Sequence, residues 1–305
     1  MHLKIHNIPS GFFSNFNMVM TALWTFLRDA QNKEPLEADI DWSDTNEWFH
    51  YGPPNVNVWN TLFEPSLNGL QGMLKVQGVS SSSSSSRRTT YDAIIREYLL
   101  DGIFITTRNA RYAYREHEWR HKLHRIYKAV IRPLPDIVLE ADRFWADCVG
   151  TTTHTRNTPL IIGMHVRAPV IAMEQGNEGW YPSLQDFANA ALTELQIHQV
   201  NGKFAKIMLA TDTQEAYSFM KEQFGDLLVF RDHSLYSNKE DHHVLGIDTV
   251  HARDVWIDAM LLARSHVFIH AVSNVATAVL YMNPYIKSVF LEAPVHVPPI
   301  KKKVL

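Results

Sequence analysis

Hydrophobic residues follow a regular pattern over the second half of the chain, after Asn157-Thr158-Pro159. Short apolar runs alternate there with longer stretches of helical periodicity, a pattern typical of a parallel sheet covered by helices. The expected strands span residues 160–166, 206–210, 227–230, 266–270 and 287–291. The expected helices span residues 184–195, 213–224, 253–263 and 274–281. We therefore expect a Rossmann-like lobe over residues 156–291.

The first half of the chain is expected to form a second lobe, over residues 1–155, because 305 residues are enough for two domains with a cleft between them. A short strand and turn over residues 11–15 are expected to lead into a helix, since Met18 and Ala22 recur at helical spacing. Residues 292–305 are expected to be a tail.

The pattern over residues 91–145 is helical again, and Pro133 and Pro135 are expected to divide it into two helices. Between these parts lie seven consecutive serines, residues 80–86. Such a composition buries too little apolar surface to become ordered, so we expect a flexible loop at about residues 78–90.

Composition and charge exclude several classes of protein. Hydrophobic residues make up 46% of the chain and charged residues 20%, which is ordinary for a globular protein. The net charge of -3 argues against a nucleic-acid partner. Cys148 is the only cysteine, so an intrachain disulfide and a cysteine zinc site are both excluded. No long apolar run is present, including over residues 1–9, so we expect no membrane segment and a cytoplasmic, bacterial or viral setting.

Residues that follow the apolar runs carry the candidate chemistry, because ligands of open parallel sheets bind beyond the carboxyl ends of the strands. His165 and Arg167 alternate with Val166 at the end of the first strand of this lobe, so both point to one face. An arginine there suits bidentate binding of a pyrophosphate, although a strand-end ion pair is an equal alternative. Asp212 and Arg231 follow later strands in the same way.

Ser273 and Asn274 lie between an expected strand and a helix of small residues. The N–H groups at such a helix start favour an anion. A serine at this position is more commonly an N-cap, and the two roles are compatible.

The sequence gives little support for a metal site and lacks the motifs of dehydrogenases, P-loop proteins and hydrolases. The pair Asp39 and Asp41 and the run Asp241-His242-His243 are more simply an accidental pair and a solvated loop, so we expect no metal. Neither a dinucleotide fingerprint, nor a P-loop, nor a Gly-x-Ser-x-Gly elbow is present.

Three segments of the first half resemble motifs of the α1,6-fucosyltransferase family, which comprises animal core fucosyltransferases and bacterial nodulation fucosyltransferases. Residues 11–17 resemble its glycine-rich first turn. Residues 59–65, Trp-Asn-Thr-Leu-Phe-Glu-Pro, resemble its W-x-x-x-F-x-P segment, and residues 127–135 resemble its K-x-x-I-R-P-x-P element.

Three more motifs follow in order in the second half. His165-Val166-Arg167 resembles the family's phosphate-binding strand end, residues 209–212 resemble its L-A-T-D segment, and Asp258 to Asn274 matches the spacing of its D-(x)15-S segment. The resemblance therefore implies an α/β fold of the GT-B type, with two Rossmann-like lobes and a nucleotide-binding cleft between them.

The resemblance also implies roles for individual residues toward a GDP-sugar donor. Arg167 would bind the β-phosphate and neutralise the leaving diphosphate, which makes it catalytic as well. Ser273 or Asn274 would meet the phosphates, and Gly11 and Ser14 would close over them.

Further roles concern recognition of the guanine and support of the site. By the same resemblance, His165 and Asp258 would contact the guanine. Asp212 would support the site, by orienting either Arg167 or His165.

The general base is expected to be Glu174, with Glu178 as the alternative, because the family's offset falls on Gln175 between them. Inversion requires a group that takes the acceptor's proton. The implied function is metal-independent, inverting transfer of L-fucose from GDP-fucose to a hydroxyl of a glycan acceptor, with no cofactor. Ala168 replaces the family's second arginine, so a transferase for another GDP-sugar and an inactive nucleotide-sugar or glycan-binding protein remain alternatives.

Overall fold

The structure is a computed structural model that describes ten segments of the chain, namely residues 2–7, 11–29, 37–43, 51–53, 55–64, 117–149, 159–167, 181–200, 204–232 and 249–291. The expected serine loop, the tail and the Asp241-His242-His243 run lie outside the described residues. No helix in the described segments combines the length and apolar character that a bilayer crossing requires.

A five-stranded parallel sheet organises the second half, with strand order β5-β4-β3-β6-β7. Its strands are β3 (Leu160–Val166), β4 (Ala205–Thr211), β5 (Leu228–Phe230), β6 (Val267–His270) and β7 (Lys287–Phe290). Every residue of β3 is buried, as its apolar sequence Leu-Ile-Ile-Gly-Met-His-Val leads one to expect for a central parallel strand. The predicted α/β class and all five predicted strands are confirmed.

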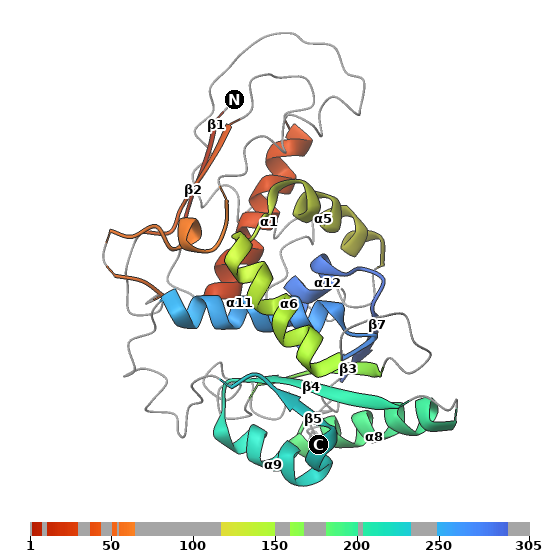
Figure 1. The fold of residues 1–305 in the computed structure, drawn as a ribbon. Helices are drawn as coiled ribbons and strands as arrows, with labels where there is room; N and C mark the ends of the chain where they lie inside the picture. The colour runs from red at the N-terminus through yellow and green to blue at the C-terminus, as the bar shows by residue number, and fades with distance from the viewer. Residues whose placement is uncertain are drawn as a thin grey trace, which may run out of the picture.

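Helices cover both faces of this sheet (Figure 1). One face carries α8 (Leu184–Val200) and α9 (Gln214–Phe224), and the other carries α11 (Thr249–Arg264) and α12 (Asn274–Met282). The change of face follows from topology, because the chain adds strands on one side of β3 and then on the other, and crossovers between parallel strands are right-handed as a rule. The four predicted helices of this half are confirmed.

The amino-terminal segment differs from the prediction at residues 11–15. Strand β1 (His2–His6) precedes this segment and pairs in parallel with β2 (Glu37–Asp41). Helix α1 (Phe12–Asp29) begins directly after Gly11, whose carbonyl accepts the N–H groups of Ser14 and Asn15 at 3.1 and 3.2 Å. The predicted order of strand, glycine turn and helix is confirmed, but the strand lies earlier, at β1, and the helix already begins at Phe12. Burial of the aromatic side chains on one helical face outweighs their intrinsic preference for strands.

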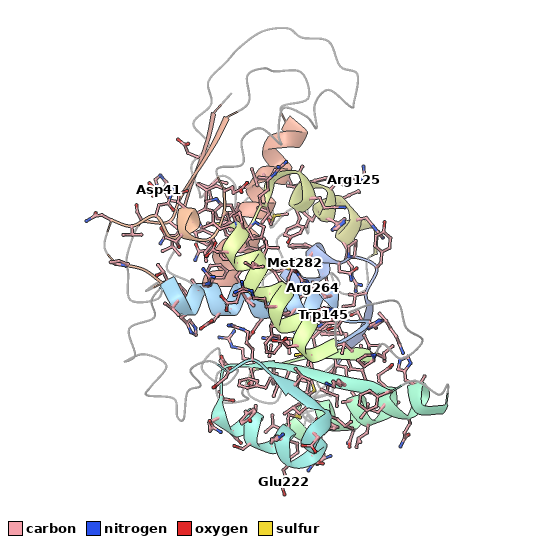
Figure 2. The ribbon with its side chains drawn as sticks, in the orientation of Figure 1. Asp41, Arg125, Trp145, Glu222, Arg264 and Met282 are labelled. Atoms are coloured by element: carbon pink, nitrogen blue, oxygen red, sulfur yellow. The ribbon has the colours of Figure 1, made fainter. Side chains whose placement is uncertain are left out.

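Two further helices, α5 (His117–Val130) and α6 (Pro135–Val149), pack on α12 and α11 respectively. The predicted division at the two prolines is confirmed, and Pro135 occupies the first helical position, where its missing N–H costs nothing. Arg264 Nη2 of α11 lies 2.7 Å from Asp142 Oδ1 of α6, near the crossing of these helices (Figure 2).

The tryptophan and proline motifs of the first half lie side by side in the structure. Phe63, which follows the 3-10 helix η1 (Val58–Thr61), forms an antiparallel bridge with Pro133. The N–H of Glu64 donates to Arg132 at 2.8 Å, and the N–H of Leu134 donates to the carbonyl of Leu62 at 2.9 Å. These two segments therefore fold as one unit.

Trp256 of α11 connects the two halves of the chain. Its ring lies 4.9 Å from that of Phe16 and 4.7 Å from that of Phe63, and it stacks on Phe13 at 6.0 Å. All of these side chains are buried and belong to one hydrophobic cluster. The cluster holds the start of α1 against the face of the sheet that α11 covers.

Candidate functional site

The order of strands reverses between β3 and β6, where the chain turns back across the sheet. Such a topological switch point is the usual ligand site of an open α/β sheet, beyond the carboxyl ends of the strands. His165 and His270 are registered neighbours at these ends. The residues that follow β3 and β6 therefore define the candidate site.

His165 is buried and contacts Ser273, whose Oγ lies 3.3 Å from its Nδ1. Burial lowers the pKa of His165 to about 4, although the charge of Asp212 acts in the opposite direction. The imidazole is therefore neutral at physiological pH. When the Ser273 hydroxyl donates to Nδ1, the ring proton resides on Nε2, which then becomes a hydrogen-bond donor.

Ser273 is the N-cap of α12, and its Oγ accepts the N–H of Ala276 at 2.9 Å. The capping interpretation is confirmed. Its second expected role, contact with a phosphate, stays a prediction. Since the same hydroxyl contacts His165, the helix start and the end of β3 are held together.

Arg167 directly follows β3, and its backbone N–H donates to the Tyr181 hydroxyl at 3.0 Å. The Nε of its guanidinium is buried and has no hydrogen-bond partner among the described residues. A buried donor without an acceptor costs about 1–3 kcal/mol, and an anion at this position would remove that cost. The geometry is compatible with anion binding by Arg167, and both this role and the strand-end ion pair stay predictions.

Tyr51 is a site residue that the sequence did not indicate. Its hydroxyl accepts the N–H of Phe12 at 3.2 Å, and its ring stacks on His251 of α11 at 5.9 Å. Burial raises the pKa of Tyr51, and the charges of Arg167 and Asp212 also act on it, so it lies close to both. A lone tyrosine in a turn carries no motif, and only the fold brings it to the end of β3.

The start of α1 therefore borders the site through Tyr51. Gly11 is exposed, and a Cβ atom there would lie 3.9 Å from the Tyr51 hydroxyl, which is ordinary contact. The protein itself does not require a glycine at this position. Ser14 lies half-buried in the first turn of α1, and its closure over a ligand stays a prediction.

Asp258 of α11 is buried and is held by Arg231, whose Nε donates to its Oδ1 at 3.0 Å. Arg231 also donates to Asp254 Oδ1 at 2.7 Å and to Glu140 Oε1 of α6 at 3.3 Å. Burial acts to lower the pKa of Arg231, but the neighbouring carboxylates outweigh this effect and raise it. The strand-end candidate Arg231 thus binds protein carboxylates and orients Asp258.

Asp212 and Asn274 complete the set of predicted binding residues that the structure describes. The charge of Asp212 acts on both His165 and Tyr51, which places it beside them. Asn274 is the first residue of α12, and Asn17 of α1 donates to it. The structure therefore brings the predicted binding residues from both halves of the chain to the carboxyl edge of the sheet.

The expected bases and the residues considered for metal binding are only partly described by the structure. Glu174 and Glu178 lie outside the described residues. Asp41 accepts from the Ser43 hydroxyl at 2.6 Å and faces His6 at 3.7 Å. In the segments that the structure covers, no three His, Cys, Asp or Glu side chains are grouped so as to hold a metal ion.

No protein-family model and no curated protein matches the sequence. Among solved structures, the chain is similar to the NodZ α1,6-fucosyltransferase co-crystallized with GDP, at 16% identity and a TM-score of 0.52, over 93% of this chain and 92% of that one. It is similar to the same enzyme soaked with GDP-fucose, at 15% identity and a TM-score of 0.50, over 93% and 92% of the two chains. A NodZ structure from Bradyrhizobium matches at 15% identity and a TM-score of 0.50, over 92% of each chain. The chain thus has the fold of the α1,6-fucosyltransferases that its motifs resemble.

Proposed function

We propose that this chain is an inverting, metal-independent fucosyltransferase that transfers L-fucose from GDP-fucose to a hydroxyl of a glycan acceptor. The observation that carries the proposal is the buried Nε of Arg167, which has no acceptor among the described residues at the switch point. It lies in a fold shared with a fucosyltransferase that binds GDP.

The donor diphosphate would bind between Arg167 and the start of α12. A guanidinium suits two phosphate oxygens at once, and the N–H groups and dipole of a helix start add further positive potential. These charges would stabilise the diphosphate as it leaves, so the reaction does not require a metal ion.

The guanine would be read by Asp258 and His165. Guanine presents adjacent N–H donors on one edge, and the carboxylate of Asp258, held by Arg231 at 3.0 Å, is an acceptor that matches them. His165, neutral because burial lowers its pKa to about 4, can donate from Nε2 without placing a second positive charge in the site. This pair would favour GDP over UDP and ADP.

In the transfer step, the acceptor hydroxyl oxygen attacks the anomeric carbon of fucose from the face opposite the diphosphate. The bond from that carbon to the phosphate oxygen breaks, and GDP leaves with the bonding electrons. Glu174 or Glu178 takes the hydroxyl proton. The anomeric configuration is inverted because a single displacement occurs.

The lobes would divide this work, with residues 1–155 on the acceptor side and residues 156–291 on the donor side. Tyr51 and the start of α1 come from the first region and border strand ends from the second. A GT-B arrangement, with the cleft between residues 1–155 and residues 156–291, is the simplest arrangement that brings residues of both regions to the site.

Thermal unfolding in the presence of GDP, UDP and ADP, each with its common sugar derivatives, tests the proposal. A ligand that binds only the folded state at 100 times its Kd stabilises it by about 2.7 kcal/mol. We expect stabilisation by GDP and its sugars alone, and release of GDP from GDP-fucose when a hydroxyl acceptor is supplied. Equal effects of all three nucleotides, or none, would contradict it.

The same experiment separates the alternatives. Preference for GDP-mannose over GDP-fucose would indicate a transferase for another sugar. Binding of GDP-fucose without transfer or hydrolysis would indicate a nucleotide-sugar-binding protein.

A further inference from the structure

Asn17 and Asn274 form a contact between α1 and α12 that the proposed reaction does not yet use. Asn17 is 8% exposed, and its Nδ2 lies 3.0 Å from the backbone carbonyl of Asn274 and 3.3 Å from Asn274 Oδ1. Asn274 is half-buried and follows Ser273, the N-cap of α12. The pair therefore lies directly beside the candidate phosphate site.

The orientation of both amides follows from their hydrogen bonds. The nitrogen and oxygen of an amide are distinguished only by their partners. A backbone carbonyl accepts and never donates, so the Asn17 atom facing it must be the NH2 nitrogen. The same nitrogen then faces the oxygen end of the Asn274 side chain. Asn17 thus keeps Oδ1 of Asn274 turned toward α1, and the NH2 group of Asn274 is directed elsewhere.

This orientation matters for an anion at the helix start. Phosphate oxygens only accept hydrogen bonds, so a side-chain oxygen facing them would repel them, whereas an NH2 group would bind them. If the Asn274 amide rotated by half a turn, its donor would be exchanged for an acceptor at the positive end of α12. Asn17 opposes that rotation because its NH2 group would then meet another NH2 group.

We propose that Asn17 is a positioning residue for the donor diphosphate, which it serves by holding the Asn274 amide with its NH2 group toward the phosphates. The inference rests on the proposed function, and it assigns to Asn17 a role that requires no contact with the ligand. It would also connect α1, near the start of the sequence, to phosphate binding at the start of α12.

If Asn17 served stability alone, its replacement would change the thermal midpoint and not specifically the affinity for GDP. Asn17 Oδ1 is buried without a hydrogen-bond partner among the described residues, and such an acceptor is unfavourable by about 1–3 kcal/mol. Leucine at this position would remove the unsatisfied oxygen together with the NH2 group. We therefore expect Asn17→Leu to leave the thermal midpoint nearly unchanged while it weakens GDP binding.

The test measures GDP and guanosine affinities of Asn17→Leu, Asn274→Ala and the double variant by calorimetry. We expect Asn17→Leu to weaken GDP binding roughly tenfold, the effect of losing one hydrogen bond to a charged group. Guanosine affinity should not change, since guanosine has no phosphates. In the Asn274→Ala background, Asn17→Leu should have no further effect, because the two residues act as a unit.

A matched control is Thr21→Val, one turn further along α1. Thr21 is also buried, and its hydroxyl donates to the Asn17 backbone carbonyl at 2.7 Å. This variant should retain the wild-type affinity for GDP. If Asn17→Leu does not fold, Asn17→Asp has the same shape but cannot donate to Asn274, and it should show the same selective loss.

Three results would overturn the inference, namely unchanged GDP affinity in Asn17→Leu, an equal loss for guanosine, or additive losses in the double variant. If the wild-type protein binds GDP no better than guanosine, the proposed diphosphate site itself is absent. That result would overturn the proposed function and this inference together, and it is visible before any variant is made.

Discussion

The Oγ of Ser273 lies 3.3 Å from Nδ1 of His165, and this contact joins the ends of two neighbouring strands, β6 and β3. Both residues are buried. The same Oγ accepts a backbone N–H of α12, so one hydroxyl connects a strand end, a helix start and a neutral imidazole. This arrangement sets the position of the groups that would meet a nucleotide.

Replacing Arg167 should weaken binding of the diphosphate. We expect Arg167→Ala to lower GDP affinity roughly tenfold to a hundredfold, because a charge-assisted hydrogen bond to a phosphate is lost. Arg167→Lys should recover only part of it, since an ammonium cannot make the paired contact. Calorimetry with GDP, with guanosine as the control ligand, provides the measurement. GDP affinity that does not change would rule out the phosphate role.

Removing the proposed base should separate binding from turnover. We expect Glu174→Gln, or else Glu178→Gln, to lower the transfer rate roughly a hundredfold or more while GDP affinity is retained. Glu222→Gln, on the exposed side of α9 (Figure 2), is the control and should transfer normally. Full turnover in both glutamine variants would exclude these two residues as the base.

The stability of the fold should decrease in acid because of buried histidines. Burial lowers the pKa of His270 to about 3 and that of His165 to about 4, from 6.5 in the unfolded chain. Below about pH 6.5 the unfolded state therefore binds protons that the folded state does not, and stability falls with pH. For each histidine the loss between about pH 7.5 and pH 5 is about 2 kcal/mol.

The variant His270→Phe isolates one of these contributions. Phenylalanine can keep the stacking on Phe268, whose ring lies 4.6 Å from that of His270, and it cannot be protonated. Urea unfolding at the two pH values should show a pH-dependent loss smaller by about 2 kcal/mol than in the wild type. The same loss in both proteins would mean that His270 does not contribute.

The Arg231 cluster should be sensitive to loss of its cation. We expect Arg231→Met to lower the free energy of unfolding by about 3–5 kcal/mol, because it leaves the carboxylates of Asp258 and Asp254 near each other without their partner. Arg253 also pairs with Glu140, at 2.9 Å, but is more exposed. Arg253→Met should therefore cost no more than about 1 kcal/mol. If denaturant unfolding shows the same loss of unfolding free energy in Arg231→Met and Arg253→Met, burial of Arg231 does not determine its contribution to stability.

Close packing at Gly163 should forbid a larger residue in the middle of β3. A Cβ atom there would lie 2.6 Å from Ser265 Oγ and 3.0 Å from Ser265 Cβ. Gly163→Ala should therefore destabilise the protein by about 1–3 kcal/mol. Adding Ser265→Gly should restore part of this loss in a double-mutant cycle. If the changes in unfolding free energy of the two substitutions are strictly additive, the contact with Ser265 is not the cause of the destabilisation by Gly163→Ala.

The sequence by itself determined the parallel sheet and its helices, because buried parallel strands require apolar runs such as residues 160–166 and their helices require a different periodicity. It also placed His165 and Arg167 at the end of a strand and Ser273 at the start of a helix, which are positions where parallel sheets bind ligands. The first turn of α1 was misjudged, since the local preference of aromatic residues is weaker than burial against Trp256. Only the tertiary structure decided that Tyr51 reaches the end of β3, that Arg231 binds Asp258, and that Asn17 contacts Asn274. These contacts join residues far apart in the chain. They depend on how the helices pack across the sheet, and a local sequence pattern does not specify that packing.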